Sequence, residues 1–351
     1  MTSCGDLRIL FRAPAGPRRG YGHLVRCRSL ARALGVRPLV ALRGGRGVGE
    51  TAVALGCDVI TGSASKVLRG FAPDVLIVDD PIAADARRWM REARRVGCLV
   101  VSIHDLGLGC LDADLVIDGS ITKNARARNG LTLAGPKYAV LDPALHDEVR
   151  SKRLQAVYSD CERDPFEVLV ALGGGPRAEL ANDIAEAIVE VNPHARVRIA
   201  GGFNGPPEGG PHFEGGPHVG FDVGAAFRRP SIEWIGPSRN LHVEMSRASV
   251  AVVGGGVSLY EACAHGVAAV AVAVVAAQRP TVSAFVERGV ARGVTRRPVS
   301  PKSVAAECAD LLTDEAIRRH MARMGQRLID GRGAFRAAAA VSRLARSGGA
   351  R

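Results

Sequence analysis

The sequence contains three glycine-rich turns, each placed between an apolar run and a helical pattern. They lie at Gly20–Gly22, Gly173–Gly175 and Gly254–Gly256. A strand that passes through such a turn directly into a helix is typical of parallel α/β sheets. The glycines let a ligand approach the backbone, and the N–H groups at the start of the following helix attract anions. Three such turns predict a diphosphate-containing ligand.

The rest of the chain also alternates between short apolar runs and amphipathic helical patterns. This alternation predicts parallel sheets that are covered by helices on both faces. The expected strands are Leu7–Arg12, Pro38–Leu42, Asp74–Asp79, Cys98–His104, Asp114–Ile117, Tyr138–Leu141, Phe166–Leu172, Ala195–Ala200, Ser231–Ile235, Ser249–Val253 and Val267–Val274. The expected helices include Ala83–Val96, Arg177–Val191, Ser258–His265, Val304–Leu312, Ala316–Leu328 and Ala334–Arg346.

A chain of 351 residues exceeds the usual size of a single hydrophobic core. Charged and polar residues from Asp147 to Asp164 interrupt the pattern and indicate a linker. We therefore expect a Rossmann-like domain over residues 1–150, a second over 151–330 and a helical tail over 331–351. The ligand is expected in a cleft that faces the carboxyl ends of the strands.

The composition argues against several classes of protein. The net charge is +12, but the arginines are spread along the chain without a basic stripe, which argues against a nucleic-acid partner. Eight scattered cysteines without a C-x-x-C motif favour a reducing cytoplasm. No apolar run reaches membrane-spanning length, so we expect a cytoplasmic protein without membrane insertion.

The first turn does not match a dinucleotide fingerprint. The third glycine of G-x-G-x-x-G would fall at Val25, whose side chain obstructs close packing of helix on strand. His23 and Cys27 have the spacing to share a metal ion, but no further ligands lie nearby. The sequence therefore predicts neither a cofactor nor a metal site. Metal dependence stays open, because Asp79, Asp80 and Asp105 could gather at strand ends, although hydrogen bonding is the alternative role for them. The sequence also lacks the G-x-S-x-G motif of serine hydrolases.

His23 is the candidate catalytic residue because it lies at the mouth of the first turn. The ordinary pKa of histidine suits proton transfer near neutral pH. Arg26, one turn further along the helix, has two interpretations. It could contact an anionic substrate, or it could be a solvated helix residue.

Several segments together resemble a known family. They are Phe11-Arg12, Gly20–Cys27, Asp79, Ser102–Asp105, Cys110–Asp118, Gly135–Leu141, Gly173-Gly174, Ser258–Ala262 and Gln278. Their order resembles the nucleotide-sugar hydrolases of pseudaminic acid biosynthesis, which are relatives of the MurG-type GT-B glycosyltransferases. That family hydrolyses UDP-2,4-diacetamido-2,4,6-trideoxy-β-L-altropyranose to UDP and the free sugar. The resemblance implies a GT-B-like fold of two Rossmann-like domains that face each other across a cleft.

The resemblance also implies roles for individual residues. His23 would be the base that activates water for attack on the anomeric carbon, with inversion, and the nucleoside diphosphate would leave. Glu261 would bind the ribose, and Gln278 the sugar or the diphosphate. The remaining substrate-binding residues would be Arg12, Gly20, Gly22, Arg26, Gly173, Gly174, Gly256 and Ser258. For Glu261 the alternative is a charge favoured by the helix dipole, and for Gln278 a capping or solvent-facing role.

The sequence departs from the family pattern in four places. Ala13-Pro14 stands where the family has Ser-Asp, and Pro81 where it has an aromatic residue. Gly175-Pro176 replaces a Thr-Asp, and Ala277 replaces an Asn. Most of these changes fall where the sugar and its N-acyl groups would be held, so the identity of the sugar stays open. Two other functions also stay open: a GT-B glycosyltransferase, in which an acceptor hydroxyl replaces water, and a non-catalytic nucleotide-sugar-binding protein.

Overall fold

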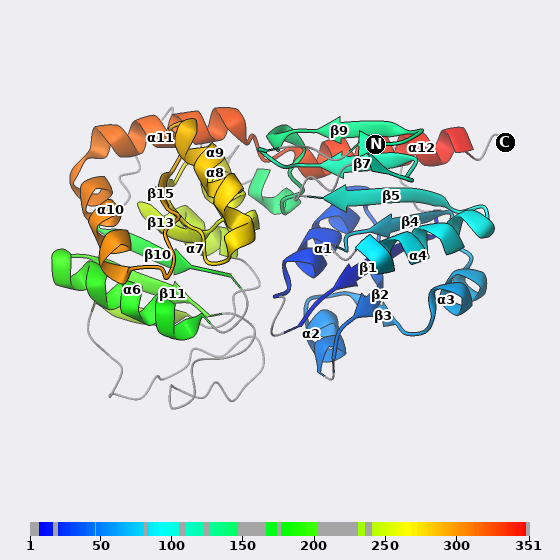
Figure 1. Ribbon diagram of the computed structural model, residues 1–351, viewed down its shortest axis with the longest axis horizontal. Helices are drawn as coiled ribbons and strands as arrows, with labels where there is room; N and C mark the ends of the chain where they lie inside the picture. The colour runs from blue at the N-terminus through cyan, green and yellow to red at the C-terminus, as the bar shows by residue number, and fades with distance from the viewer. Residues whose placement is uncertain are drawn as a thin grey trace. The chain divides into compact units, whose positions relative to one another are not determined.

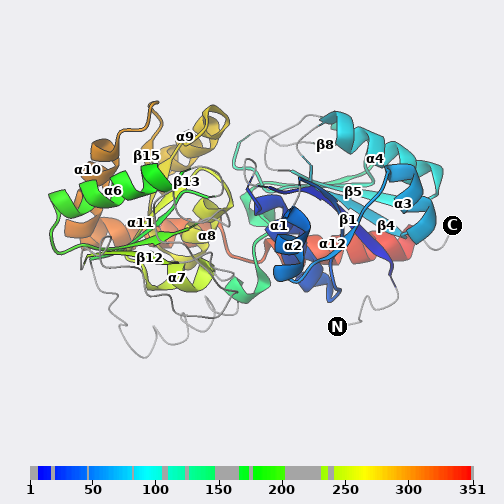
Figure 2. The ribbon, with the colours of Figure 1, turned by 90° about the horizontal axis from the view of Figure 1, so that it is seen from below.

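The computed structural model describes residues 7–16, 20–45, 47–80, 83–104, 110–122, 126–146, 166–173, 177–201, 231–235 and 241–348. The chain forms two compact units. Unit 1 comprises Met1–Asp147 together with Ile329–Arg351, and unit 2 comprises Glu148–Leu328. Each unit has a parallel sheet with helices on both faces, as Figures 1 and 2 show. The prediction of α/β architecture with two Rossmann-like halves is confirmed.

Unit 1 is built on a seven-stranded sheet in the order β3-β2-β1-β4-β5-β7-β9. The strands are β1 (Ile9–Pro14), β2 (Leu39–Arg43), β3 (Asp58–Ile60), β4 (Val75–Val78), β5 (Leu99–His104), β7 (Leu115–Asp118) and β9 (Leu131–Ala134). Every neighbouring pair is parallel. Every residue of β1, β4 and β7 is buried, as expected for central strands covered on both faces. A short pair, β6 (Cys110–Leu111) with β8 (Arg126–Ala127), lies beside the main sheet.

The helices of unit 1 are α1 (Gly22–Leu34), α2 (Val48–Ala54), α3 (Ala64–Phe71), α4 (Ala83–Arg95) and α12 (Gly333–Gly348). On one face of the sheet, Leu68 of α3 and Trp89 and Met90 of α4 pack against Leu76 and Val100. α12 reaches this unit from the far end of the chain and packs beside α1 (Figure 2).

A close backbone approach anchors the start of α12. A Cβ on Gly333 would lie 2.0 Å from the carbonyl oxygen of Ala139, so only glycine fits there. The Arg336 guanidinium donates to the carbonyl of Lys137 at 2.8 Å and binds Asp330. The segment expected as a separate helical tail is therefore part of the packing of unit 1.

Unit 2 repeats the architecture with a six-stranded sheet in the order β12-β11-β10-β13-β14-β15. The strands are β10 (Glu167–Ala171), β11 (Arg196–Ala200), β12 (Ile232–Ile235), β13 (Val250–Gly254), β14 (Ala268–Val272) and β15 (Arg292–Val294). Its helices are α6 (Ala178–Val191), α7 (Leu241–Arg247), α8 (Val257–His265), α9 (Arg279–Glu287), α10 (Pro301–Thr313) and α11 (Glu315–Leu328). α6 and α10 pack together on one face, where Ile184, Val304 and Leu311 are fully buried. Among the described helices, none has the length and hydropathy required to cross a membrane.

Both sheets reverse their winding at one place. In unit 1 the order changes direction between β1 and β4, and in unit 2 between β10 and β13. The connections that leave two such strands run to opposite sides, which leaves a crevice at their carboxyl ends. Ligands of open α/β sheets bind at this switch point. Each of the three glycine-rich turns follows a different one of these four strands: β1, β10 or β13.

One predicted strand is wrong. Tyr138–Leu141 does not form a strand; Pro136–Tyr138 form a 3₁₀ turn (η1), and the partner of β7 is the more exposed β9. Gly135 turns the chain with φ 102°, and Pro136 has no N–H group to donate to a strand ladder. The apolar residues Val140 and Leu141 are still buried, which explains why their pattern resembles a strand.

Candidate active site

The first glycine-rich turn carries the chain from β1 into α1. Gly16 and Gly20 bond to each other through both backbone amides, with N···O distances of 3.2 and 2.8 Å. Gly20 has φ 77°, in the left-handed region that favours glycine. A Cβ on Gly22 would meet no described atom within 4 Å, so this glycine leaves the start of the helix unobstructed. No side chain among the described residues caps α1.

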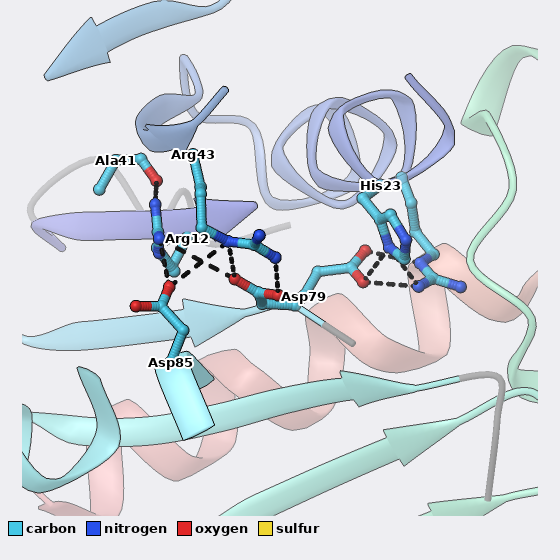
Figure 3. Close-up of polar contacts among 8 residues, drawn as sticks. Arg12, His23, Ala41, Arg43, Asp79 and Asp85 are labelled. Atoms are coloured by element: carbon cyan, nitrogen blue, oxygen red, sulfur yellow. Dashed lines mark hydrogen bonds and ion pairs between the residues drawn. The ribbon is translucent and has the colours of Figure 1, made fainter. Parts of the chain in front are cut away.

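His23 lies in the first turn of α1 and points toward Asp79, the residue that follows β4 (Figure 3). Nδ1 of His23 is 2.8 Å from Oδ1 of Asp79. Because an ionised carboxylate only accepts hydrogen bonds, Nδ1 carries a hydrogen atom and donates a hydrogen bond to Asp79. Nε2 therefore holds the lone pair that can accept a proton. The His23 side chain is 20% exposed, whereas that of Asp79 is 1% exposed.

Arg26 binds the same carboxylate with two parallel hydrogen bonds. Its Nε donates to Oδ2 at 2.6 Å and its Nη2 donates to Oδ1 at 2.5 Å. Nη2 is also 3.2 Å from Nδ1 of His23. Burial raises the pKa of Asp79, but the charge of Arg26, with His23 and their hydrogen bonds, outweighs burial and holds that pKa well below its usual range. Arg26 is buried, so it is not a solvated helix residue.

Arg12, predicted to contact the substrate, lies in a second buried cluster of charges (Figure 3). Its Nη1 donates to the carbonyl of Ala41 at 2.9 Å, and its Nη2 pairs with Asp85. The guanidinium also stacks 4.9 Å from the Trp89 ring. Beside it, Arg43 binds Asp80 through Nε at 3.0 Å and Nη2 at 2.5 Å. These contacts hold the carboxyl ends of β1, β2 and β4 together.

In unit 2, the turn after β10 contains Gly173, whose φ is 85°. The side chain of Arg177 folds back over this turn and donates from Nη1 to the carbonyl of Leu172 at 2.9 Å. Burial lowers the pKa of Arg177. α6 starts at the next residue without a side-chain cap among the described residues. Gly174, a predicted contact, lies outside the described residues.

The turn after β13 brings several predicted residues together. Gly255 is packed so closely that a Cβ would lie 2.8 Å from Cγ2 of Val282 and 3.0 Å from Cβ of Gln278. A Cβ on Gly256 would lie 3.8 Å from Nε2 of Gln278. Oε1 of Gln278 is buried and has no hydrogen-bond partner among the described residues. Gln278 therefore lies beside the start of α8.

The N-terminus of α8 has an open set of donors. Neither a capping side chain nor an acidic residue in the first turn is present among the described residues. By contrast, Ser63 caps α3 and Ser300 caps α10, each accepting a bond from a backbone N–H. Uncapped N–H groups and the helix dipole favour an anion at the start of α8. Ser258 lies in this first turn, and Glu261 follows one turn later; both are half-buried.

The sequence did not identify Asp79 as a partner of His23. The signal was present, because Asp79 and Asp80 end the fully apolar strand Val75–Val78. Their partners are set by the sheet order, since β1 and β4 are neighbours although 56 positions of sequence separate His23 from Asp79. No group of three or more potential metal ligands occurs in the described part of the chain.

No protein-family model matches the sequence. Over 243 residues the chain is 25% identical to the spore coat polysaccharide biosynthesis protein SpsG of Bacillus subtilis strain 168. The match covers 66% of this chain and 65% of SpsG, so it spans a little less than two thirds of that relative.

Solved structures match over nearly the whole chain. The spinosyn forosaminyltransferase SpnP aligns with a TM-score of 0.64 at 14% identity, covering 97% of this chain and 99% of that one. MurG of Acinetobacter baumannii aligns with a TM-score of 0.59 at 11% identity, covering 96% and 99%. The chain has the GT-B fold. The GT-B architecture implied by the family resemblance is thus confirmed.

Proposed function

We propose that this protein displaces a nucleoside diphosphate from a nucleotide sugar, with His23 as the general base. Nε2 of His23 takes the proton of an attacking hydroxyl while the oxygen of that hydroxyl bonds to the anomeric carbon. The bond from this carbon to the diphosphate oxygen breaks, and the configuration inverts. The observation that carries the proposal is the 2.8 Å contact between Nδ1 of His23 and the buried Asp79, which leaves Nε2 as the acceptor.

Asp79 orients the imidazole and stabilises the imidazolium that forms when Nε2 gains its proton. A buried carboxylate has this role beside the catalytic histidine of many hydrolases. Proton transfer by a positioned base contributes about 10²–10⁴-fold to a rate.

Unit 2 holds the nucleotide in this proposal. The developing negative charge on the diphosphate is met by the uncapped N–H groups at the start of α8 and by its dipole. The buried Oε1 of Gln278 accepts from a hydroxyl of the sugar, because a phosphate carries no proton to donate at neutral pH. Glu261 accepts from the ribose hydroxyls.

Two nucleophiles fit this chemistry. The comparisons favour an acceptor hydroxyl and hence glycosyl transfer, since SpnP is named as a transferase and SpsG as a polysaccharide biosynthesis protein. Water is the second candidate. It is supported by the segment Gly20–Cys27, which resembles the opening motif of the nucleotide-sugar hydrolases.

Nucleotide release from a panel of UDP-, GDP- and CMP-sugars, with and without mixed sugar acceptors, tests the proposal. Release only with an acceptor identifies a transferase, and release without one identifies a hydrolase. Replacement by His23→Gln should abolish either reaction, whereas His320→Gln, a change on the exposed surface of α11, should not. Binding of a nucleotide sugar without any turnover would contradict catalysis and support a binding protein.

A further inference from the structure

The buried carboxylate of Asp79 has more positive charge around it than the orientation of His23 requires. A neutral imidazole needs one hydrogen bond from Nδ1, and that bond is present. Arg26 nevertheless places a full positive charge on both oxygens of the same carboxylate. The Arg26 side chain is 6% exposed, so its charge is poorly screened by water. This second cation requires an explanation.

The explanation lies in the protons that the His23–Asp79 pair can hold. A buried carboxylate next to an imidazole attracts a second proton, because an imidazolium would neutralise it. The pair would then be an imidazolium–carboxylate ion pair with a proton on Nε2, and the base would be lost. Two interacting groups take up protons as a pair, so anything that neutralises Asp79 lowers the affinity of the pair for that second proton.

We propose that Arg26 is a positioning residue that neutralises Asp79 and thereby keeps Nε2 of His23 free to accept a proton from the substrate. In this role Arg26 replaces the substrate contact expected for it from the sequence. The proposal deepens the proposed function and rests on His23 being the base. Arg26 acts in two ways: it satisfies the carboxylate, and its Nη2, 3.2 Å from Nδ1, repels a proton on the imidazole.

The other charged and titratable groups around the pair are already engaged. Cys27 is fully buried on the same helix, where burial, the largest effect, raises the pKa of its thiol well above the ordinary value and keeps it neutral. At the neighbouring strand ends, Asp80 pairs with Arg43 and Arg12, Asp118 with Ser120 and His104 with Ser102. On the adjacent helices, Asp85 pairs with Arg12, and Arg336 of α12 pairs with Asp330. Within the described residues, Arg26 is thus the cation in contact with Asp79.

The direct test is the pH titration of the His23 imidazole signals by NMR in the substrate-free protein. Relative to wild type, Arg26→Met should move the midpoint for proton uptake to higher pH by about 1 unit or more. Arg26→Lys keeps the charge but loses the two parallel hydrogen bonds to Asp79, and its titration midpoint should lie much closer to that of wild type. Arg32→Met is the matched control, because Arg32 lies on the same helix and pairs with a different carboxylate, Asp142. An unchanged midpoint in Arg26→Met would overturn the proposal.

A second pair of variants covers the case in which Arg26→Met does not fold. Asp79→Asn and the double variant Asp79→Asn/Arg26→Met differ only in the charge of Arg26, and the double variant leaves no unpaired buried ion. The proposal expects proton uptake by His23 at higher pH in the double variant. Because both variants lack the carboxylate, this pair measures the repulsion of the imidazole proton by Arg26 alone, and equal midpoints would contradict that part of the proposal.

Kinetics separate this proposal from the proposed function. In Arg26→Met the acidic limb of the pH–rate profile should move to higher pH, and the rate should recover at alkaline pH. A substrate contact would instead raise KM without moving the limb, and a structural role would lower the rate at every pH. A shifted NMR midpoint in a protein whose turnover survives His23→Gln would uphold the role of Arg26 and reject His23 as the base.

Discussion

The switch points of the two sheets have the same topology and opposite chemistry. In unit 1 the carboxyl ends of β1, β2 and β4 carry charged side chains that bind one another. In unit 2 the ends of β10 and β13 carry glycine turns, and helix α8 begins there with uncapped backbone donors. Unit 1 thus presents a histidine held by ions beside the uncapped start of α1, whereas unit 2, within its described residues, presents backbone donors at the uncapped start of α8 without such ions. In the proposed function, proton transfer is assigned to unit 1 and anion binding to unit 2.

At the switch point of unit 1, the charges of six side chains cancel one another. Three guanidinium groups face three carboxylates: Arg12, Arg26 and Arg43 against Asp79, Asp80 and Asp85. With neutral His23, this cluster has no excess positive charge with which to hold a diphosphate. The start of α8 has no acidic residue in its first turn, so its donors and dipole remain available to an anion.

The largest effect is expected from His23→Gln in unit 1. Loss of the base should lower kcat by about 10²–10⁴-fold, because the attacking hydroxyl then keeps its proton. The dissociation constant for the nucleoside diphosphate should not change, since unit 2 holds that group. Steady-state kinetics and calorimetric titration measure the two quantities. A large loss of nucleotide affinity in this variant would break the proposed division.

Asp79→Ala should reduce stability strongly. It leaves the buried guanidinium of Arg26 without its carboxylate, and breaking a buried ion pair on one side costs about 3–5 kcal/mol. Urea unfolding measures the change. Asp58→Ala is the control, because it removes an exposed ion pair with Arg37 and should cost less than about 1 kcal/mol. Equal losses in the two variants would show that the burial of Asp79 has no energetic consequence.

Gly255→Ala tests the turn of unit 2. The added Cβ would lie within 3.0 Å of Val282 and Gln278, and overpacking of this kind costs about 1–3 kcal/mol. Nucleotide affinity should fall because Gln278 is displaced from the start of α8. Gly70→Ala in α3, where a Cβ meets no described atom within 4 Å, should be neutral or stabilising. Full nucleotide affinity in Gly255→Ala would contradict the role of this turn.

The smallest effect is a pH dependence of stability in unit 1. The folded state holds the pKa of Asp79 below its unfolded value, so the carboxylate stabilises the protein fully above the unfolded pKa. That contribution is lost as the pH falls below the unfolded value of about 3.9 toward the folded one. Urea midpoints should therefore decrease between pH 5 and pH 3, and Asp79→Asn should show a shallower decrease. An identical slope in Asp79→Asn would show that other groups control acid stability.

Much of the fold could be predicted from the sequence because its signals are local. The glycine turns, the buried strands such as Val75–Val78 and helices such as Arg177–Val191 each depend on neighbouring residues. The return of α12 to unit 1 could not be predicted, because an alanine-rich helix shows no preference for one sheet over another. The edge strand β9 was missed because its residues are too exposed to show a buried pattern.

In the candidate site too, local features could be predicted from the sequence and long-range contacts could not. His23 and the start of α8 could be predicted, since a histidine in a glycine turn and a glycine-to-helix junction are visible in a few residues. The ion pair between Arg26 and Asp79 could not be predicted, because 53 positions separate the two residues and only the sheet order makes them neighbours. The contacts of Arg12 could not be predicted either, because its partners come from two other segments, β2 and α4.

A titration of the ¹⁵N-labelled protein with UDP tests the proposed division of work between the two switch points. Amide shifts should be largest at Gly173 and from Gly254 to Leu259, and small from Gly20 to Leu24. Large shifts from Gly20 to Leu24 with none at the start of α8 would contradict the account.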